Sequence, residues 1–138
     1  MEKGTVKHFL NNREEYSNEE FLEELKQKNQ KLNLMREIVD ADQRSSSPNT
    51  SDESKEENSG ELNDIPFVVK DAICTENTTT SAGSKILENY EPVFDATVIE
   101  RLKESGASFY GKTQQDEFGF GTFSTHCAFE TPKNPHDE

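Results

Sequence analysis

Apolar side chains recur with helical spacing near the start of this chain. Ser17 followed by Glu20 forms a capping box, a pair typical of helix N-termini. The apolar positions after it are Phe21, Leu22, Leu25, Leu32, Leu34, Met35, Ile38 and Val39. Acidic residues fill the first turns, which favours a helix packed on its own protein over one lying on a membrane surface. We therefore predict an N-terminal helical segment over residues 1–41.

A polar segment follows, over residues 42–60. It is rich in serine and acidic residues, contains no aromatic residue, and has Thr50 as its one β-branched position. Such a segment cannot bury enough apolar surface to offset the entropy lost on ordering. We predict an acidic, Ser-rich, disordered linker that leads into a denser third part over residues 61–138.

The third part alternates strand and helix patterns. Residues 65–73 read as a buried strand entered through a proline, which is tolerated at a strand start. Asp95 is expected to cap a helix that ends at Gly106. The apolar positions of this helix are Ala96, Val98, Ile99 and Leu102. Residues 107–110 give a second strand, ended by Gly111. Strand, helix and strand in this order predict a βαβ crossover and hence an α/β fold.

Two other stretches read as loops. Residues 75–84 are polar and rich in threonine. Residues 118–123 are interrupted by glycines, and their lone G-x-G lacks the strand and helix context of a dinucleotide fingerprint. We expect neither stretch to form a regular element.

Composition limits the classes of function. The 138 residues fit at most one ordinary domain, and 30% apolar content is poor material for a large core. The formal charge of −13 argues against autonomous nucleic-acid binding, which needs clustered Lys and Arg. We see neither a signal peptide nor a membrane-spanning run of about 20 apolar residues. Cys74 and Cys127 read as reduced thiols, so we expect a cytoplasmic protein with no membrane contact.

Lys70 is the first candidate for chemistry. Strand alternation places it on one face with Val68 and Ala72, within an apolar strand. Burial penalises an ammonium group, so a desolvated lysine has a lowered pKa and can act as a base. A lysine in a strand is, however, more often one that reaches solvent at a sheet edge.

The other polar candidates read as structural. His126 and Cys127 are neighbours, and neighbours in an extended segment point opposite ways, so they cannot pair as base and nucleophile. The three histidines and two cysteines lack zinc-site spacing, and we expect no metal. Asp116 and Glu117 are adjacent carboxylates without a predicted partner, for which a solvated or structural role is the default.

A series of short blocks from residue 62 onward resembles the amidase-signature family, with a weaker match over residues 17–35. The blocks are residues 65–71, 84–90, 95–102, 106–107, 111–113, 116–119 and the pair Asn134-Pro135. They follow one another in the order that the family shows. The resemblance implies a partial amidase-signature fold: N-terminal helices, then the first strands and crossover helix of a mixed sheet. Residues 116–118 resemble the branch that contains the A subunits of aspartyl/glutamyl-tRNA(Asn/Gln) amidotransferases.

The resemblance implies a Ser–cis-Ser–Lys mechanism. The family lysine, which Lys70 matches, is the general base and is neutral in the free enzyme. It draws a proton through a bridging serine and so activates a second serine. That serine attacks the side-chain amide of glutamine, a covalent glutamyl-enzyme forms, and ammonia leaves. Gly121 and Thr122 match the loop near the family's amide-binding pocket and are the implied substrate-binding residues.

The resemblance also implies partners. Ammonia would pass to the B subunit of the amidotransferase, with or without a C subunit in the complex. There, ATP with Mg would activate the side-chain carboxylate of Glu-tRNA(Gln) or Asp-tRNA(Asn). ATP and tRNA would bind mainly outside this chain, which agrees with its acidity, and we expect no cofactor on the chain itself.

The chain also departs from the family pattern. Both family serines lie in Gly/Ser-rich blocks beyond Asn134-Pro135, and this sequence ends at Glu138, so we expect the chain alone to be an inactive fragment. Family residues are replaced at Asp64, Gln114, Gln115, Thr125, His126, Cys127 and Glu130. These changes alter the substrate loop and leave Lys70 in place. The alternatives are a non-catalytic remnant, an interaction module, or a fragment of a broad-specificity amidase.

Overall fold

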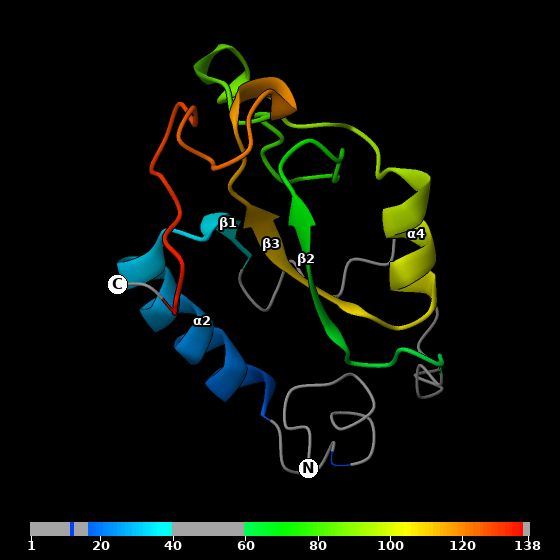
Figure 1. The fold of residues 1–138 in the computed structure, drawn as a ribbon. Coiled ribbons are helices and arrows are strands. Elements are labelled where there is room, and N and C mark those ends of the chain that lie inside the picture. The colour runs from blue at the N-terminus through cyan, green and yellow to red at the C-terminus, as the bar shows by residue number, and fades with distance from the viewer. Residues whose placement is uncertain (1–11, 13–16, 40–59, 137–138) are drawn as a thin grey trace.

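The computed structural model describes residue 12 and residues 17–39 and 60–136 (Figure 1). The predicted linker over residues 42–60 lies outside these residues except for Gly60, as does most of the segment before Ser17. Among the described residues, none of the helices has the length and apolar character needed to cross a bilayer.

Helix α2 spans Asn18–Leu32 and begins as predicted, because the Ser17 side chain accepts a hydrogen bond from the Glu20 backbone N–H at 3.4 Å. It ends at Asn33, whose φ of 53° is left-handed and whose N–H donates to the Asn29 carbonyl. The predicted continuation of the helix towards Val39 is wrong. Strand β1 occupies Met35–Ile38 instead, and the Asn29 side chain accepts a hydrogen bond from the Met35 N–H at 2.7 Å.

The sheet has three strands in the order β1-β3-β2. Strand β2 covers Pro66–Lys70 and lies parallel to β3, Ser108–Thr113, whereas β1 pairs with β3 in the antiparallel sense. Helix α4, Thr97–Glu104, connects β2 to β3 and lies to one side of the sheet, while α2 lies to the other (Figure 1). The predicted βαβ crossover and the α/β class are therefore confirmed.

Helix α4 ends as expected but does not begin as expected. Its N-cap is Ala96, without a side-chain cap, so the capping role predicted for Asp95 is wrong. The Asp95 carboxylate instead forms a salt bridge with Lys103 at 2.5 Å and accepts a hydrogen bond from the Glu76 N–H at 2.8 Å. At the other end Gly106 has a φ of 87° and donates to the Lys103 carbonyl, which a left-handed glycine after a helix allows.

The apolar core lies where β2, β3 and α4 meet. Its buried members are Val39, Val69, Ile99 and Phe109, with Phe67, Ile73 and Ala96 packed against them. Strand β2 is therefore buried on one face only, and the prediction of a wholly buried strand is wrong: Val69 is 4% exposed and Val68 is 44% exposed. Strand β3, in contrast, is the central strand of the sheet and is buried along most of its length.

The segment after β2 contains no helix or strand between residues 75 and 84, as predicted, but it lies inside the molecule. Its buried side chains are Thr75, Thr78, Thr80, Ser81 and Ser84. A buried segment without a ladder of backbone bonds needs other partners for its polar groups. Several of these partners belong to two buried charged side chains, Asp71 and Lys112.

Candidate functional site

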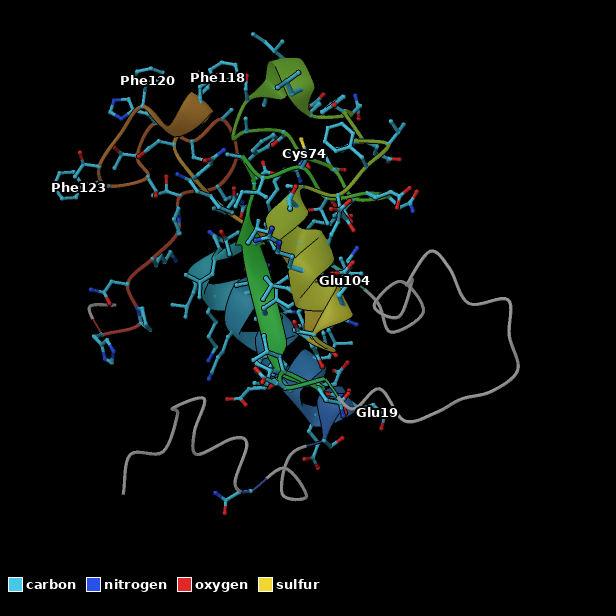
Figure 2. The ribbon with its side chains drawn as sticks, turned by 90° about the vertical axis from the view of Figure 1, so that its right-hand side faces the viewer. Glu19, Cys74, Glu104, Phe118, Phe120 and Phe123 are labelled. Carbon is cyan, nitrogen blue, oxygen red and sulfur yellow. The ribbon has the colours of Figure 1, made fainter. Side chains whose placement is uncertain are left out.

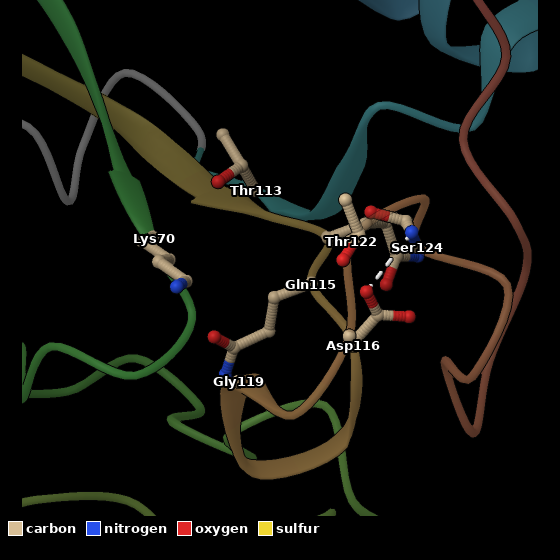
Figure 3. Close-up of a pocket in the computed structure, with 9 residues that line it drawn as sticks. Lys70, Thr113, Gln115, Asp116, Gly119, Thr122 and Ser124 are labelled. Atoms are coloured by element: carbon tan, nitrogen blue, oxygen red, sulfur yellow. Dashed lines mark hydrogen bonds between the residues drawn. The ribbon is translucent and has the colours of Figure 1, made fainter.

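A cavity of about 280 Å³ opens between the end of β2 and the segment that follows β3 (Figure 3). Its lining residues are Lys70, Thr113, Gln114, Gln115, Asp116, Gly119, Gly121, Thr122 and Ser124. The three residues singled out by the sequence are Lys70, Gly121 and Thr122. They line one cavity, although about 50 positions separate Lys70 from the other two.

Lys70 is the last residue of β2 and projects from the exposed face of the strand. The predicted alternation holds, since Val68, Lys70 and Ala72 are exposed and Val69 and Asp71 are buried. The Lys70 ammonium lies near Gly119, where an added Cβ would be 3.9 Å from Nζ. The described residues thus place the lysine at the cavity wall but do not bury it, in contrast to the desolvated setting that an apolar strand suggested.

Asp116 organises the opposite wall of the cavity. Its carboxylate is buried and accepts two backbone hydrogen bonds, from Ser124 N–H at 2.9 Å and from His126 N–H at 2.8 Å. Gly121 packs against this carboxylate so closely that a Cβ there would overlap it. The structural role expected for Asp116 is confirmed, and the solvated alternative is wrong. Its carboxylate closes the loop that carries Gly121 and Thr122.

Glu117 ties the same loop to the segment after β2. Its Oε1 accepts a hydrogen bond from the Ser84 hydroxyl at 2.6 Å. Two backbone bonds add to this link, from Phe118 N–H to the Ala82 carbonyl at 2.8 Å and from Ala128 N–H to the Gly83 carbonyl at 3.2 Å. For convenience, we call residues 116–128 the pocket loop and residues 73–83 the buried loop.

Gln115 contributes an unpaired amide beside the cavity. Its side chain is 4% exposed, and neither Nε2 nor Oε1 has a hydrogen-bond partner among the described residues. Figure 3 shows this side chain between Lys70 and Gly119. Leaving a buried amide unpaired costs free energy, so the amide is a group that a ligand or further polypeptide would stabilise.

Lys112 is a buried charged residue that sequence reasoning missed. It is completely buried in β3, and its ammonium donates to the Ile73 carbonyl, to the Thr75 hydroxyl at 3.2 Å and to the Thr80 hydroxyl at 2.9 Å. Burial lowers the pKa of Lys112, and nearby negative charge, first that of Asp71, opposes the shift. The sequence feature that could have identified Lys112 is its position in a strand that continues past Gly111.

The lowered pKa of Lys112 predicts how stability depends on pH. Between the folded pKa and the value of about 10.4 for a free lysine, the unfolded chain binds more protons than the folded chain. The free energy of unfolding contributed by Lys112 should therefore rise with pH across this alkaline window. Urea titrations of the wild type and of Lys112→Met at several alkaline pH values give the difference between their free energies of unfolding, which is the contribution of Lys112. If this difference stays constant or falls as the pH rises, the prediction is wrong.

His126 and Cys127 do not form a catalytic pair. The Cys127 thiol donates to the Gln114 side-chain oxygen at 3.4 Å, and the His126 ring is exposed and lies 3.3 Å from the Thr125 hydroxyl. Within residues 17–39 and 60–136, no group of three or more His, Cys, Asp or Glu side chains is placed to hold a metal ion.

Comparison with known proteins gives a family assignment that agrees with the fold. The model of the amidase family matches residues 17–138, and the chain belongs to that family. Two curated relatives are A subunits of glutamyl-tRNA(Gln) amidotransferase. The protein from Syntrophobacter fumaroxidans is 48% identical over 53% of this chain and 15% of its own length. The protein from Archaeoglobus fulgidus is 49% identical over 57% of this chain and 17% of its own length.

A solved structure extends the comparison to three dimensions. The A subunit of glutamyl-tRNA(Gln) amidotransferase from Thermotoga maritima superposes with a TM-score of 0.62 at 36% identity, over 78% of this chain and 21% of that protein. A second structure, from a study of an s-triazine catabolic enzyme, has a TM-score of 0.69 at 23% identity over 96% of this chain, which shows the shared fold alone. The chain thus spans about a sixth of the curated relatives and a fifth of the Thermotoga protein.

Proposed function

We propose that this chain carries the lysine-bearing part of the glutaminase subunit of a tRNA-dependent amidotransferase. The observation that carries the proposal is the single cavity shared by Lys70, Gly121 and Thr122. Relatives named as A subunits of glutamyl-tRNA(Gln) amidotransferase support the same assignment.

In the proposed reaction Lys70 acts as the general base. A serine hydroxyl is a weak nucleophile at its own pKa and needs a base to accept its proton. The ammonium group reaches the cavity from the exposed end of β2, so it can meet a hydroxyl supplied from outside the described residues. Polypeptide packed over Lys70 would remove it from water. The bridging serine and the nucleophilic serine belong to such polypeptide in this proposal.

The wall formed by the pocket loop supplies the substrate side of the cavity. The loop that carries Gly121 and Thr122 is closed by the Asp116 carboxylate, which accepts from the Ser124 and His126 N–H groups. The unpaired amide of Gln115 adds hydrogen-bonding capacity. A small amide such as glutamine suits this mixture of amide, hydroxyl and carboxylate groups. The released ammonia would serve the B subunit of the complex, with or without a C subunit, where ATP, Mg and tRNA bind. The charge of −13 favours a chain that leaves tRNA to such a partner.

A chimera tests the proposal. Residues 17–136 of this chain replace the matching part of the Thermotoga maritima protein, and ammonia release from glutamine is measured. We expect the purified chimera to release ammonia from glutamine, because the transplanted residues supply the base and the substrate wall. The unaltered Thermotoga protein and a chimera whose pocket loop keeps the Thermotoga sequence serve as matched controls.

The outcomes separate the alternatives. A folded chimera that hydrolyses other primary amides but not glutamine would instead favour a broad-specificity amidase. A folded chimera that hydrolyses neither would favour a non-catalytic remnant or an interaction module. Circular dichroism and gel filtration establish folding before activity is compared.

A further inference from the structure

Two buried opposite charges hold the segment between β2 and α4. Lys112 lies in β3, and Asp71 directly follows Lys70. Their exposed fractions are 0% and 1%, so both ions have lost their hydration. A buried ion is tolerated only where hydrogen bonds and opposite charge replace that hydration.

Each ion is matched by groups of the buried loop. The Lys112 ammonium has three protons, and three oxygens accept from it: those of Ile73, Thr75 and Thr80. The three span the buried loop from its first residue to Thr80. All are neutral, so the ammonium acts on this part of the chain as a fixed cross-link.

Asp71 holds the end of the buried loop in the same way. Its carboxylate accepts from the Ser81 N–H at 3.1 Å, from the Ser81 hydroxyl, and from the Gly83 N–H at 3.2 Å. The buried loop is therefore fixed at both ends, by Lys112 to β3 and by Asp71 to the end of β2. Charge-assisted hydrogen bonds of this kind are stronger than neutral ones.

We propose that Lys112 and Asp71 are positioning residues that set the separation between Lys70 and the pocket loop. The role of the cavity in this proposal rests on the proposed function. The way in which the two sides of the cavity are kept apart is argued from geometry alone. The backbone fixes Lys70 on one side, because β2 pairs Val69 with Lys112 and Lys70 with Thr113. The buried loop then connects Asp71 and Lys112 to the pocket loop, on the other side of the cavity from Lys70.

Three contacts complete the connection. Gly83, which Asp71 holds, and its neighbour Ala82 accept hydrogen bonds from the Ala128 and Phe118 N–H groups of the pocket loop. The Ser84 hydroxyl donates to Glu117. If Lys112 and Asp71 act as proposed, loosening the buried loop frees the pocket loop without unfolding the sheet. A purely structural role would instead lower the stability of the whole fold.

Amide hydrogen exchange on the 138-residue chain distinguishes these two roles. Phe118 and Ala128 report on the pocket loop, and Val39, whose N–H donates to the Tyr110 carbonyl, reports on the sheet. In Thr80→Val the acceptor is lost with little change of shape, and one Lys112 proton is left unpaired. We expect exchange at Phe118 and Ala128 to accelerate roughly tenfold relative to Val39. Thr80→Ser keeps the hydroxyl and should restore the ratio towards the wild-type value.

Two further variants sharpen the test. Lys112→Met removes all three bonds and should raise the exchange ratio further and shift the Gly119 and Gly121 amide resonances. Ile99→Val, in the core of α4, is a matched destabilising control that should accelerate all three amides together. Equal acceleration at the pocket loop and the sheet in Thr80→Val would overturn the proposal. In the wild type itself, Lys112 Nζ protons that exchange as fast as those of exposed Lys28 would also overturn it.

The exchange test separates this inference from the proposed function. None of its readouts requires catalysis. An altered exchange ratio combined with a chimera that does not need Lys70 would leave the positioning role standing and reject the function. An unchanged ratio combined with a Lys70-dependent chimera would reject the positioning role alone.

Discussion

Replacing Lys70 by alanine in the active chimera is expected to lower kcat for glutamine hydrolysis by about 10²–10⁴-fold, the usual contribution of a general base. The side chain lines the cavity at the end of β2, and Lys70 is not a member of the apolar core formed by the described residues. The loss should therefore fall on kcat, with KM changed much less, because the wall that holds the substrate is unaltered. Steady-state ammonia release over a range of glutamine concentrations measures both constants.

Two substitutions control for charge and for exposure. Lys70→Arg keeps a positive charge that does not dissociate in proteins, so it cannot act as a base and should be as inactive as the alanine variant. Lys85→Ala removes another exposed lysine, outside the cavity, and should leave both constants near those of the chimera. Retention of kcat in Lys70→Ala would show that Lys70 is not the general base. Full activity in Lys70→Arg would show that Lys70 contributes only its positive charge.

The sequence predicted best where a local signal had no competitor. The proline at the start of β2, the capping box at Ser17 and the left-handed glycine at position 106 each act over a few residues. Each signal appears in the structure as expected. The order of strand, helix and strand then settled the crossover, because a parallel pair needs such a connection.

Predictions failed where a distant partner decided the outcome. Residues 35–39 continue a helical spacing, but Met35 pairs with Thr113 and Val39 enters the core, and neither partner is near them in sequence. Asp95 is a good capping residue by type, but Lys103 and the Glu76 backbone engage its carboxylate. Local propensity is a weak prior that tertiary contacts override.

In the candidate site, too, the sequence predicted some residues and missed another. Lys70 was a candidate from its place in an apolar strand and from the family pattern, whereas Gly121 and Thr122 came from the family pattern alone. The fold brings all three to one cavity. Lys112 was overlooked because the strand was ended at Gly111, whereas β3 continues through it to Thr113. A lysine inside a central strand would have been recognised at once as a buried charge in need of partners.

Three exposed phenylalanine side chains lie on the pocket loop. Phe118, Phe120 and Phe123 project from the pocket loop (Figure 2), and their exposed fractions are 50%, 86% and 81%. The same loop carries Gly121 and Thr122, which line the cavity with Lys70.

Gly111 is the position where a single methyl group should destabilise the fold most. Its φ of 134° disfavours any residue with a Cβ. A Cβ there would also overlap the Glu37 carbonyl oxygen and lie 3.0 Å from the Ile38 Cα, so β1 would have to move away from β3. Overpacking and backbone strain each cost about 1–3 kcal/mol. We expect Gly111→Ala to lower the free energy of unfolding by about 4 kcal/mol in urea titrations.

Gly119 offers a control that has a positive φ without the crowding. Its φ is 76°, and the nearest atom to an added Cβ is the Lys70 Nζ at 3.9 Å, an ordinary contact. Gly119→Ala should therefore cost about 1 kcal/mol, the conformational part alone. The difference between the two variants reports the crowding against β1 together with the greater backbone strain at Gly111, whose φ of 134° lies far from the left-handed region that other residues can adopt. If both variants lose the same free energy of unfolding, β1 can move away from β3 without destabilising the protein. The pairing of β1 with β3 would then contribute little to stability.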